Sequence, residues 1–484
     1  MLLVAAGLVV GLAVSFHWFG WSSIPGNECG DGFTPCPEGT VPTLLLAFLC
    51  SFAGVALVIW RVAELIKVRP GKALPVVLVV TGMLLALWPG WLAYAWMRGP
   101  VLDRAWEAPV DRPGNVRGVG NWTLDGAVVR ARTDGLTSYD LADGHERWNV
   151  DAPTRGSACA MSDTVVDGIG VIAFGREDQP CDRVWGLDTG SGRKLWERKI
   201  TGGAGFGPAT DGRVAADSGV AVALEDAAVR GFVLRTGVPR WKLPLGEGCS
   251  PVVASASAGR TRVVVQCLSG GSAFRSLQLV SLDTSTGTHV RRTALPVESR
   301  WEAVMVLSAR PFVLWLKEKD DRGTDAVLAF DDQDRPRGSV EVSRGDEDLR
   351  MTVDAGQGFG ARPVLRAAVV GDVLVTAVTK PGEAVPDAVS GYELGGGRRL
   401  WQAGAGGQVT ALTRLPGNRL AVLEGGRIGS LDARTGHLTE GPLIREGLDD
   451  VAEAAQLVPG RNGGWLLVNP DGTGVTPPLL RVGP

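Results

Sequence analysis

Few residues in this sequence have the types and spacing that catalysis or metal binding requires. Ser191 and Lys194 show the Ser-x-x-Lys spacing of some serine nucleophiles. They fall in a predicted turn, however, whereas an activated serine needs a buried setting beside its base. The run from Asp331 to Asp334 offers oxygen ligands for calcium but lacks the spacing of an EF-hand loop. A solvated turn is therefore the favoured interpretation of this acidic run.

Cysteines are the other residues with chemical potential. The sequence has seven, of which Cys50 lies in an apolar segment and the other six form close pairs along the chain. No Cys-x-x-Cys motif occurs and only four histidines are present, which disfavours a zinc site. Proximity favours local disulfides, with other pairings and buried free thiols as the alternatives. The predicted pairs are Cys29 with Cys36, Cys159 with Cys181, and Cys249 with Cys267.

A short pattern recurs beyond residue 104: an apolar stretch, an acidic residue, a glycine-containing turn and often a tryptophan. It predicts a β-hairpin in which the aspartate accepts backbone N–H groups and glycine supplies a positive φ. The tryptophan offers a flat surface for packing against a neighbouring unit, and its N–H can meet a backbone carbonyl. We expect these residues to be structural: Asp140 with Trp148, Asp188 with Trp196, Trp241, Asp283, Asp331, Trp401 and Asp432.

The spacing of the pattern indicates its architecture. From Asp140 to Asp432 the chain covers 292 residues in six intervals, or about 49 per repeat, close to the ~40 to 50 residues of a four-stranded propeller blade. The form Leu-Asp-x-x-x-Gly-x-x-x-Trp at Leu187 to Trp196 resembles the pyrroloquinoline-quinone-type propeller repeat. The resemblance covers roughly residues 104–484 and implies an all-β propeller.

Several copies depart from this form. The copy ending at Trp241 has arginine in place of aspartate, those at Asp283 and Asp432 lack the tryptophan, and the one at Asp331 lacks both glycine and tryptophan. Residues 464–472 resemble a degenerate eighth unit, and the segment around Trp106 resembles the last strand of a blade. We therefore expect eight blades, with seven as the alternative, and a final blade completed by the N-terminal strand, which leaves no exposed edge.

The resemblance also raises an enzymatic hypothesis, because some propellers of this type are quinone-dependent dehydrogenases. Such enzymes typically place two adjacent cysteines against the cofactor, and this sequence has no Cys-Cys dipeptide. No motif matches their calcium ligands or catalytic aspartate either. We accordingly assign no catalytic, cofactor-binding or metal-binding residue and expect a protein without a cofactor.

Three apolar segments precede the repeats. Residues 2–21, 41–60 and 73–97 contain no Asp, Glu, Lys or Arg, and each could cross a bilayer, which needs ~20 residues. A cleaved signal peptide is the alternative for the first, but its basic start is missing. The sequence thus predicts a membrane anchor over residues 1–100 and a propeller over residues 101–484.

The charges of the two loops between these segments predict their orientation. The second loop holds Arg61, Lys67, Arg69 and Lys72, whereas the first has acidic residues and no Lys or Arg. Because short basic loops stay in the cytoplasm, the N-terminus would be inside and the propeller outside. Disulfides would suit that oxidising side.

Composition narrows the function without identifying it. The formal net charge is −3, so the basic footprint of a nucleic-acid-binding protein is missing. Abundant Ala, Gly, Val and Arg with few Lys are typical of high-GC bacteria, notably actinobacteria. We expect a non-enzymatic, multi-pass membrane protein whose propeller binds an unknown protein or cell-envelope ligand. The alternatives are a ligand sensor acting through a separate partner and a quinone-dependent dehydrogenase.

Overall fold

The computed structural model describes residues 2–22, 39–65, 73–114, 116–176, 179–202, 212–268, 275–352, 364–444, 455–460, 463–469 and 477–483. It divides into two units. The first comprises Met1–Asp103 with Pro442–Glu446, and the second comprises Arg104–Gly441 with Gly447–Pro484. Cys29, Cys36 and most of the two loops between the apolar segments lie outside the described residues.

The first unit contains three apolar helices. They are α1 (Leu2–Ser22), α2 (Thr40–Leu65) and α3 (Ala73–Arg98). Each contains a stretch long and apolar enough to cross a membrane, namely Leu3–Ser22, Thr40–Leu57 and Val77–Met97. The predicted segments therefore form helices, whose ends differ from the expected ones by up to five residues.

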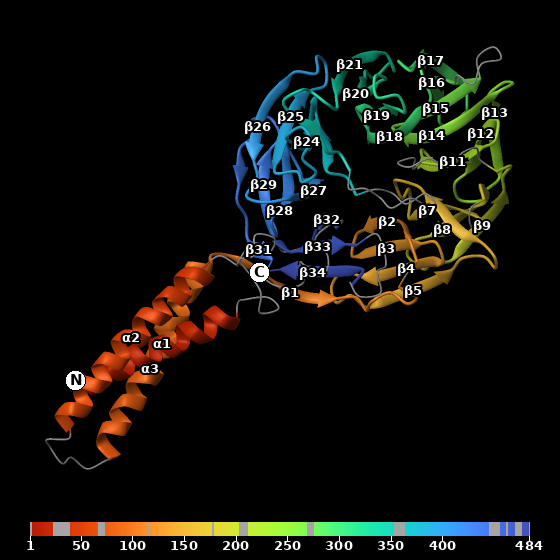
Figure 1. Ribbon diagram of the computed structural model, residues 1–484. Helices are drawn as coiled ribbons and strands as arrows, with labels where there is room; N and C mark the ends of the chain where they lie inside the picture. Colours follow the sequence, from red (N-terminus) through yellow and green to blue (C-terminus); the bar gives the residue numbers. More distant parts are fainter. Residues whose placement is uncertain are drawn as a thin grey trace. The chain divides into compact units, whose positions relative to one another are not determined.

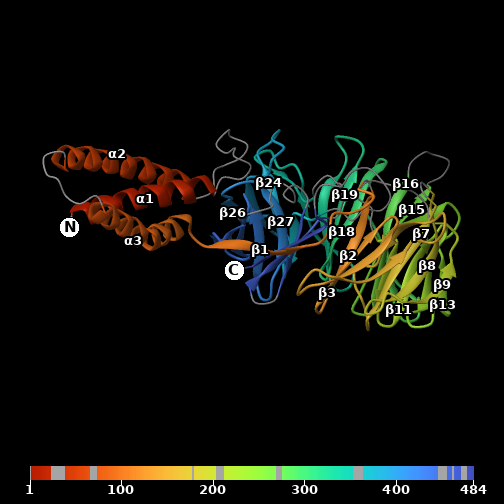
Figure 2. The same ribbon diagram turned by 90° about the horizontal axis from the view of Figure 1, so that it is seen from below.

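Glycines bring α1 close to α3. A Cβ at Gly7 would lie 2.3 Å from the carbonyl oxygen of Val79, and a Cβ at Gly82 would lie 2.4 Å from that of Val4. Small residues at such positions let two helix backbones approach, which is how helices associate in lipid. Helix α1 thus lies between α2 and α3 (Figure 2).

The second unit is an all-β propeller, whose blades follow one another around a ring in chain order (Figure 1). The described strands form seven sheets, and the largest, with nine strands, contains both the seventh and the eighth blade. The first four blades are β2 (Gly118–Leu124), β3 (Ala127–Arg132), β4 (Gly135–Asp140) and β5 (Glu146–Asp151); β6 (Ser157–Met161), β7 (Ile169–Gly175), β8 (Cys181–Asp188) and β9 (Lys194–Lys199); β10 (Val214–Asp217), β11 (Val220–Glu225), β12 (Ala228–Val233) and β13 (Pro239–Pro244); and β14 (Cys249–Ser257), β15 (Arg260–Leu268), β16 (Arg275–Asp283) and β17 (His289–Ala294).

The remaining blades include one with an extra short strand. They are β18 (Trp301–Ala309), β19 (Phe312–Glu318), β20 (Asp325–Phe330) and β21 (Pro336–Glu341); β22 (Asp348–Leu349), β23 (Ala367–Val370), β24 (Val373–Thr379), β25 (Ala388–Glu393) and β26 (Arg399–Gly404); β27 (Val409–Arg414), β28 (Arg419–Glu424), β29 (Arg427–Asp432) and β30 (Leu438–Thr439); and β32 (Gln456–Pro459), β33 (Trp465–Val468) and β34 (Leu479–Gly483).

The eighth blade is completed by the N-terminal strand. Strand β1 (Val101–Glu107) pairs with β34 on one side and with the short β31 (Leu443–Ile444) on the other. The first and last strands of the repeat region thus share one sheet. The expected eight blades and their closure by the segment around Trp106 are therefore confirmed.

Buried apolar side chains lie between successive blades. One cluster joins Val171 and Val184 of the second blade to Ala221 and Phe232 of the third. Successive residues of a strand point to opposite faces of a blade, so each blade packs apolar side chains against both neighbouring blades. The repeat therefore folds as a closed ring of packed sheets.

Candidate binding site in the propeller

The tryptophans of the repeat each lie against the next blade. The indole N–H groups donate to backbone carbonyls 38 to 43 residues away in three of them: Trp148 to Thr189 at 3.2 Å, Trp196 to Leu234 at 2.6 Å and Trp241 to Thr284 at 3.0 Å. Trp401 donates to Ala433 at 3.0 Å. These partners all belong to the following blade, so the tryptophans join blades and are not free to bind a ligand.

Glycines make room for these rings. A Cβ at Gly192 would lie 2.6 Å from the ring of Trp148, and a Cβ at Gly287 would lie 2.4 Å from that of Trp241. Both glycines have a positive φ, of 72° and 71°, which favours glycine over other residues. The glycine of the turn therefore closes its own hairpin and also receives the tryptophan of the blade before it.

The aspartates of the repeat hold the hairpin turns. Asp188 accepts the N–H of Ser191 at 2.9 Å, and Asp432 accepts those of Arg434 and Thr435, both at 2.9 Å. The Ser191 hydroxyl together with its N–H lowers the pKa of Asp188, and the two backbone N–H groups lower that of Asp432, because hydrogen bonds favour the charged carboxylate. Corresponding bonds occur at Asp140, Asp283 and Asp331.

The copy of the repeat that lacks glycine forms its turn with a different residue. Asp334 has a φ of 60° and occupies the position of the missing glycine. Its carboxylate is buried, 1% exposed, and pairs with the guanidinium of Arg262 from the preceding blade. A solvated turn was expected here, and for Asp334 that expectation was wrong, because Arg262 compensates the buried charge.

Neither chemical motif of the sequence forms a reactive group. The Ser191 hydroxyl donates to Asp188 at 2.8 Å, while the Lys194 amine pairs with Glu197 at 2.7 Å. The Asp331 carboxylate accepts N–H groups of its own turn and pairs with Arg335. Among the described residues no group of three His, Cys, Asp or Glu lies close enough to hold a metal ion.

Two pairs of cysteines are joined in the propeller. Cys159 is bonded to Cys181 within the second blade, and Cys249 to Cys267 within the fourth. Each bond connects two strands of one sheet. Cys50 is a free cysteine.

Sequence reasoning missed a set of buried carboxylates. Glu225, Glu318 and Glu424 each end the second strand of a blade and are almost fully buried. Glu318 accepts the N–H groups of Glu298 at 2.8 Å and Thr324 at 2.6 Å, so it ties two loops together. The sequence signal for these carboxylates was an acidic residue at the end of a strongly apolar strand. The same pattern occurs where an exposed acidic residue begins an ordinary turn.

Glu347 is the centre of a second missed cluster, in the sixth blade. It is 1% exposed and accepts hydrogen bonds from Ser390 at 2.8 Å, Arg399 at 2.7 Å and the hydroxyl of Tyr392. Burial raises the pKa of Tyr392 well above its ordinary value. The carboxylate fixes the loop before β22 to the outer strands of the same sheet.

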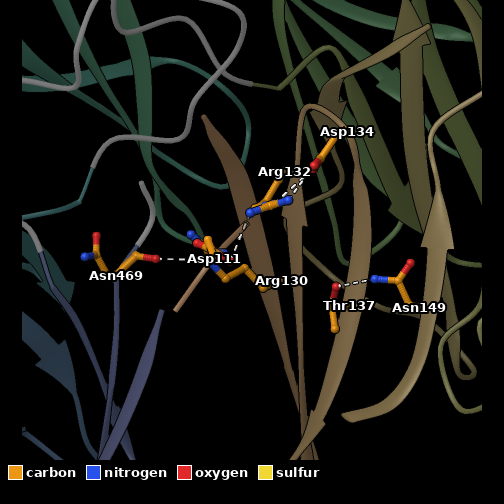
Figure 3. Close-up of polar contacts among 7 residues, drawn as sticks. All are labelled: Asp111, Arg130, Arg132, Asp134, Thr137, Asn149 and Asn469. Carbon is orange, nitrogen blue, oxygen red and sulfur yellow. Dashed lines mark hydrogen bonds and ion pairs between the residues drawn. The ribbon is translucent and has the colours of Figure 1, made fainter. Parts of the chain in front are cut away.

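A buried ionic cluster joins the first blade to the last (Figure 3). Asp111, in the segment after β1, contacts Arg130 of β3 at 2.7 Å and Arg132 of β3 at 3.1 Å. Arg130 also donates to the backbone carbonyl of Asn469, at 3.0 Å, just beyond β33. Burial lowers the pKa of Arg130, and the neighbouring Asp111 opposes that shift. The three segments that meet at ring closure are thus linked by one arginine.

A central cavity lies where the first strands of several blades meet. Its volume is about 600 Å³. Met305, Leu307, Val369 and Leu412 make one side largely apolar. Arg414 lies at its border and also lines a polar hollow of about 670 Å³, together with Arg310 and Asp372. The cavity therefore has an apolar wall, with the charged side chain of Arg414 at its border.

Comparison with known proteins supports the repeat architecture. Residues 103–335 match a family model described as outer membrane protein assembly factor BamB. No curated protein matches the chain. The match is consistent with a PQQ-type repeat over the first five blades.

Solved structures similar to this chain include BamB and quinohemoprotein alcohol dehydrogenases by their titles. BamB from Moraxella catarrhalis is 14% identical, with a TM-score of 0.43, over 79% of this chain and 97% of that one. The quinohemoprotein alcohol dehydrogenase ADHIIG from Pseudomonas putida is 12% identical, with a TM-score of 0.48, over 79% and 75%. The corresponding dehydrogenase from Comamonas testosteroni is 11% identical, with a TM-score of 0.46, over 79% and 76%.

Proposed function

We propose that this protein is a non-enzymatic binding or scaffold protein of the bacterial cell envelope. Its three apolar helices would anchor it in the cytoplasmic membrane, and the propeller would stand on the outer side. The observation that carries the proposal is the match of residues 103–335 to the BamB-like family model. A rigid propeller with the turns of eight blades exposed on two faces suits the binding of an extended partner.

The engagement of the repeat residues supports the same conclusion. The tryptophans of the pattern pack on glycines of the next blade, and the aspartates hold hairpin turns. Two blades also carry disulfides. Disulfides are typical of proteins that fold in an oxidising compartment. A stable scaffold outside the cytoplasm explains both features.

The quinone cofactor of related dehydrogenases does not fit the residues present. The chain has no adjacent cysteine pair. Among the described residues that line the central cavity, Asp163 is the only carboxylate. Calcium prefers six to eight oxygen ligands. We derive no step through this cofactor. A calcium-dependent dye-reduction assay with added quinone should stay flat, and turnover above background would restore the dehydrogenase hypothesis.

Labelling of single cysteines tests the proposed topology. Val385 is 52% exposed in the propeller, whereas Lys67 belongs to the basic loop between the second and third helices. In intact cells, a membrane-impermeant maleimide should label a Val385→Cys variant and spare Lys67→Cys until the cells are lysed. The reverse pattern would place the propeller in the cytoplasm.

Cross-linking tests the binding role. Full-length protein, cross-linked in cells and purified in mild detergent, should retain an envelope component at near-stoichiometric yield. The control is an unrelated three-helix membrane protein produced at the same level. Capture of the same proteins by both would contradict the scaffold proposal.

A further inference from the structure

The outermost strands of three successive blades carry an excess of positive charge. Strands β9, β13 and β17 together contain seven Lys or Arg and one carboxylate, Glu197. The outermost strands of the other five blades, β1, β5, β21, β26 and β30, together contain four Arg and five carboxylates. The positive charge is therefore confined to one part of the ring.

Four of these cations are exposed and have no carboxylate partner among the described residues. Lys194 and Lys242 pair with Glu197 and Glu225. Among the ion pairs of the described residues, none involves the remaining exposed cations of these strands. We call this set the basic rim; it consists of Lys199, Arg240, Arg291 and Arg292.

The blades that carry the basic rim are held in a fixed order. Trp196 of β9 docks on the third blade and Trp241 of β13 docks on the fourth. Arg198 donates from β9 to the carbonyl of Gly237, at 2.7 Å, in the turn before β13. Strands β9, β13 and β17 accordingly follow one another along the outer side of the ring (Figure 1). The four charges thus lie on the outermost strands of three blades that are held in a fixed order.

Protection of sheet edges does not account for this distribution. Charged residues on an edge strand hinder pairing with another chain, and either sign serves that purpose. Every blade has an outermost strand, so edge protection alone predicts no preference for three adjacent blades. An excess of one sign in one sector instead matches the electrostatic footprint of an anionic partner.

We propose that the basic rim binds an extended polyanion with phosphate groups along its backbone. Guanidinium groups, which three of the four residues supply, hydrogen-bond phosphate in a bidentate manner. The surface curves around the outside of the ring, so a flexible polymer can contact all three blades, whereas a flat bilayer reaches few of them. This inference deepens the proposed envelope-binding role and rests on it for the location of the propeller.

Inorganic polyphosphate provides a direct probe. Binding of a fluorescent polyphosphate to full-length protein in uncharged detergent would be measured by anisotropy at several salt concentrations. The test variant is Lys199→Glu/Arg240→Glu/Arg292→Glu. The control is Arg322→Glu/Arg398→Glu/Arg434→Glu, which changes net charge equally at exposed sites outside the basic rim.

The rim variant should weaken binding at least about tenfold and reduce the salt dependence by about one per lost phosphate contact. The control should stay within about twofold of the parent protein. Thermal unfolding of all three proteins verifies that the substitutions leave the fold intact. Arg240→Lys/Arg292→Lys should retain most of the binding, because the charge persists.

Two results would overturn the inference. An equal loss in both variants would mean that only net charge matters. Binding to vesicles of anionic phospholipid, without binding to polyphosphate, would assign the basic rim to a bilayer. A protein partner that still co-purifies with the rim variant would leave the proposed scaffold function standing while the polyanion inference fails.

Discussion

The ring of Trp106 lies directly over Gly144, and a Cβ at that glycine would come within 2.4 Å of the indole. Trp106 belongs to the N-terminal strand β1, and Gly144 forms the hairpin turn of the first blade. The contact joins the eighth blade to the first by the same docking that joins the second to the third. Ring closure therefore uses the ring-over-glycine packing of the repeat. Among the described residues the indole N–H of Trp106 meets no acceptor, unlike those of the other repeat tryptophans.

Gly144→Ala should weaken this closure. Gly144 and Gly219 have similar φ values, 76° and 73°, but nothing lies within 4 Å of a Cβ at Gly219. Alanine at Gly219 should cost about 1 kcal/mol, the strain of a positive φ. At Gly144 the displaced ring should raise the loss to about 3 kcal/mol. Denaturant unfolding followed by tryptophan fluorescence compares the two, and equal losses would contradict the docking role of Trp106.

Asp111→Ala should destabilise the closing cluster more than an exposed ion pair does. It leaves Arg130 buried without its carboxylate, which costs about 3 to 5 kcal/mol. Glu107→Ala is the control, because Glu107 pairs with Arg104 at the surface and should change stability by less than about 1 kcal/mol. Adding Arg130→Met to Asp111→Ala should recover much of the loss. Unfolding midpoints of the four proteins test this, and no recovery would refute the ionic explanation.

The hairpin aspartates should make the propeller sensitive to acid. The pKa values of five carboxylates lie below the ordinary 3.8. Side-chain hydroxyl groups are the main cause at Asp188 and Asp283, and backbone N–H groups are the main cause at Asp140, Asp331 and Asp432. A lowered folded-state pKa contributes stability above pH 3.8, and that stability disappears as the pH falls through the folded-state value. The thermal midpoint should drop steeply below about pH 4. Asp432→Asn should reduce that drop, and an unchanged pH profile in this variant would exclude Asp432 as a contributor.

Removal of the Cys249–Cys267 bond should destabilise the fourth blade. The bond closes a separation of 18 residues, for which loss of the cross-link is worth about 3 kcal/mol. Cys249→Ala/Cys267→Ala should lower the unfolding midpoint and abolish its response to reductant at this site. The free Cys50 provides the control, since Cys50→Ala should keep that response. Reductant effects of equal size in parent and double variant would show that the other disulfide dominates.

The sequence by itself determined the repeat and the apolar segments. Both depend on short-range patterns: a hairpin needs its aspartate and glycine within a few residues, and a spanning helix needs one uninterrupted apolar run. The docking role of Trp148, Trp196, Trp241 and Trp401 also followed, because the same residue returned at the same place in several copies of the repeat.

Only the tertiary structure decided which charges are buried and with what partners. Arg130 meets a backbone carbonyl 339 residues away, and Arg262 meets Asp334 across 72 residues, separations that no local pattern encodes. From the sequence, Asp334 is expected to be an exposed turn residue. In the structure Arg262 of the preceding blade lies beside it and compensates its buried charge. The basic rim has the same origin, since its cations are distant in sequence and reach the outermost strands of neighbouring blades only when three blades pack in order. Closure of the ring brings such residues together. A local sequence pattern does not show which distant residues closure will place side by side.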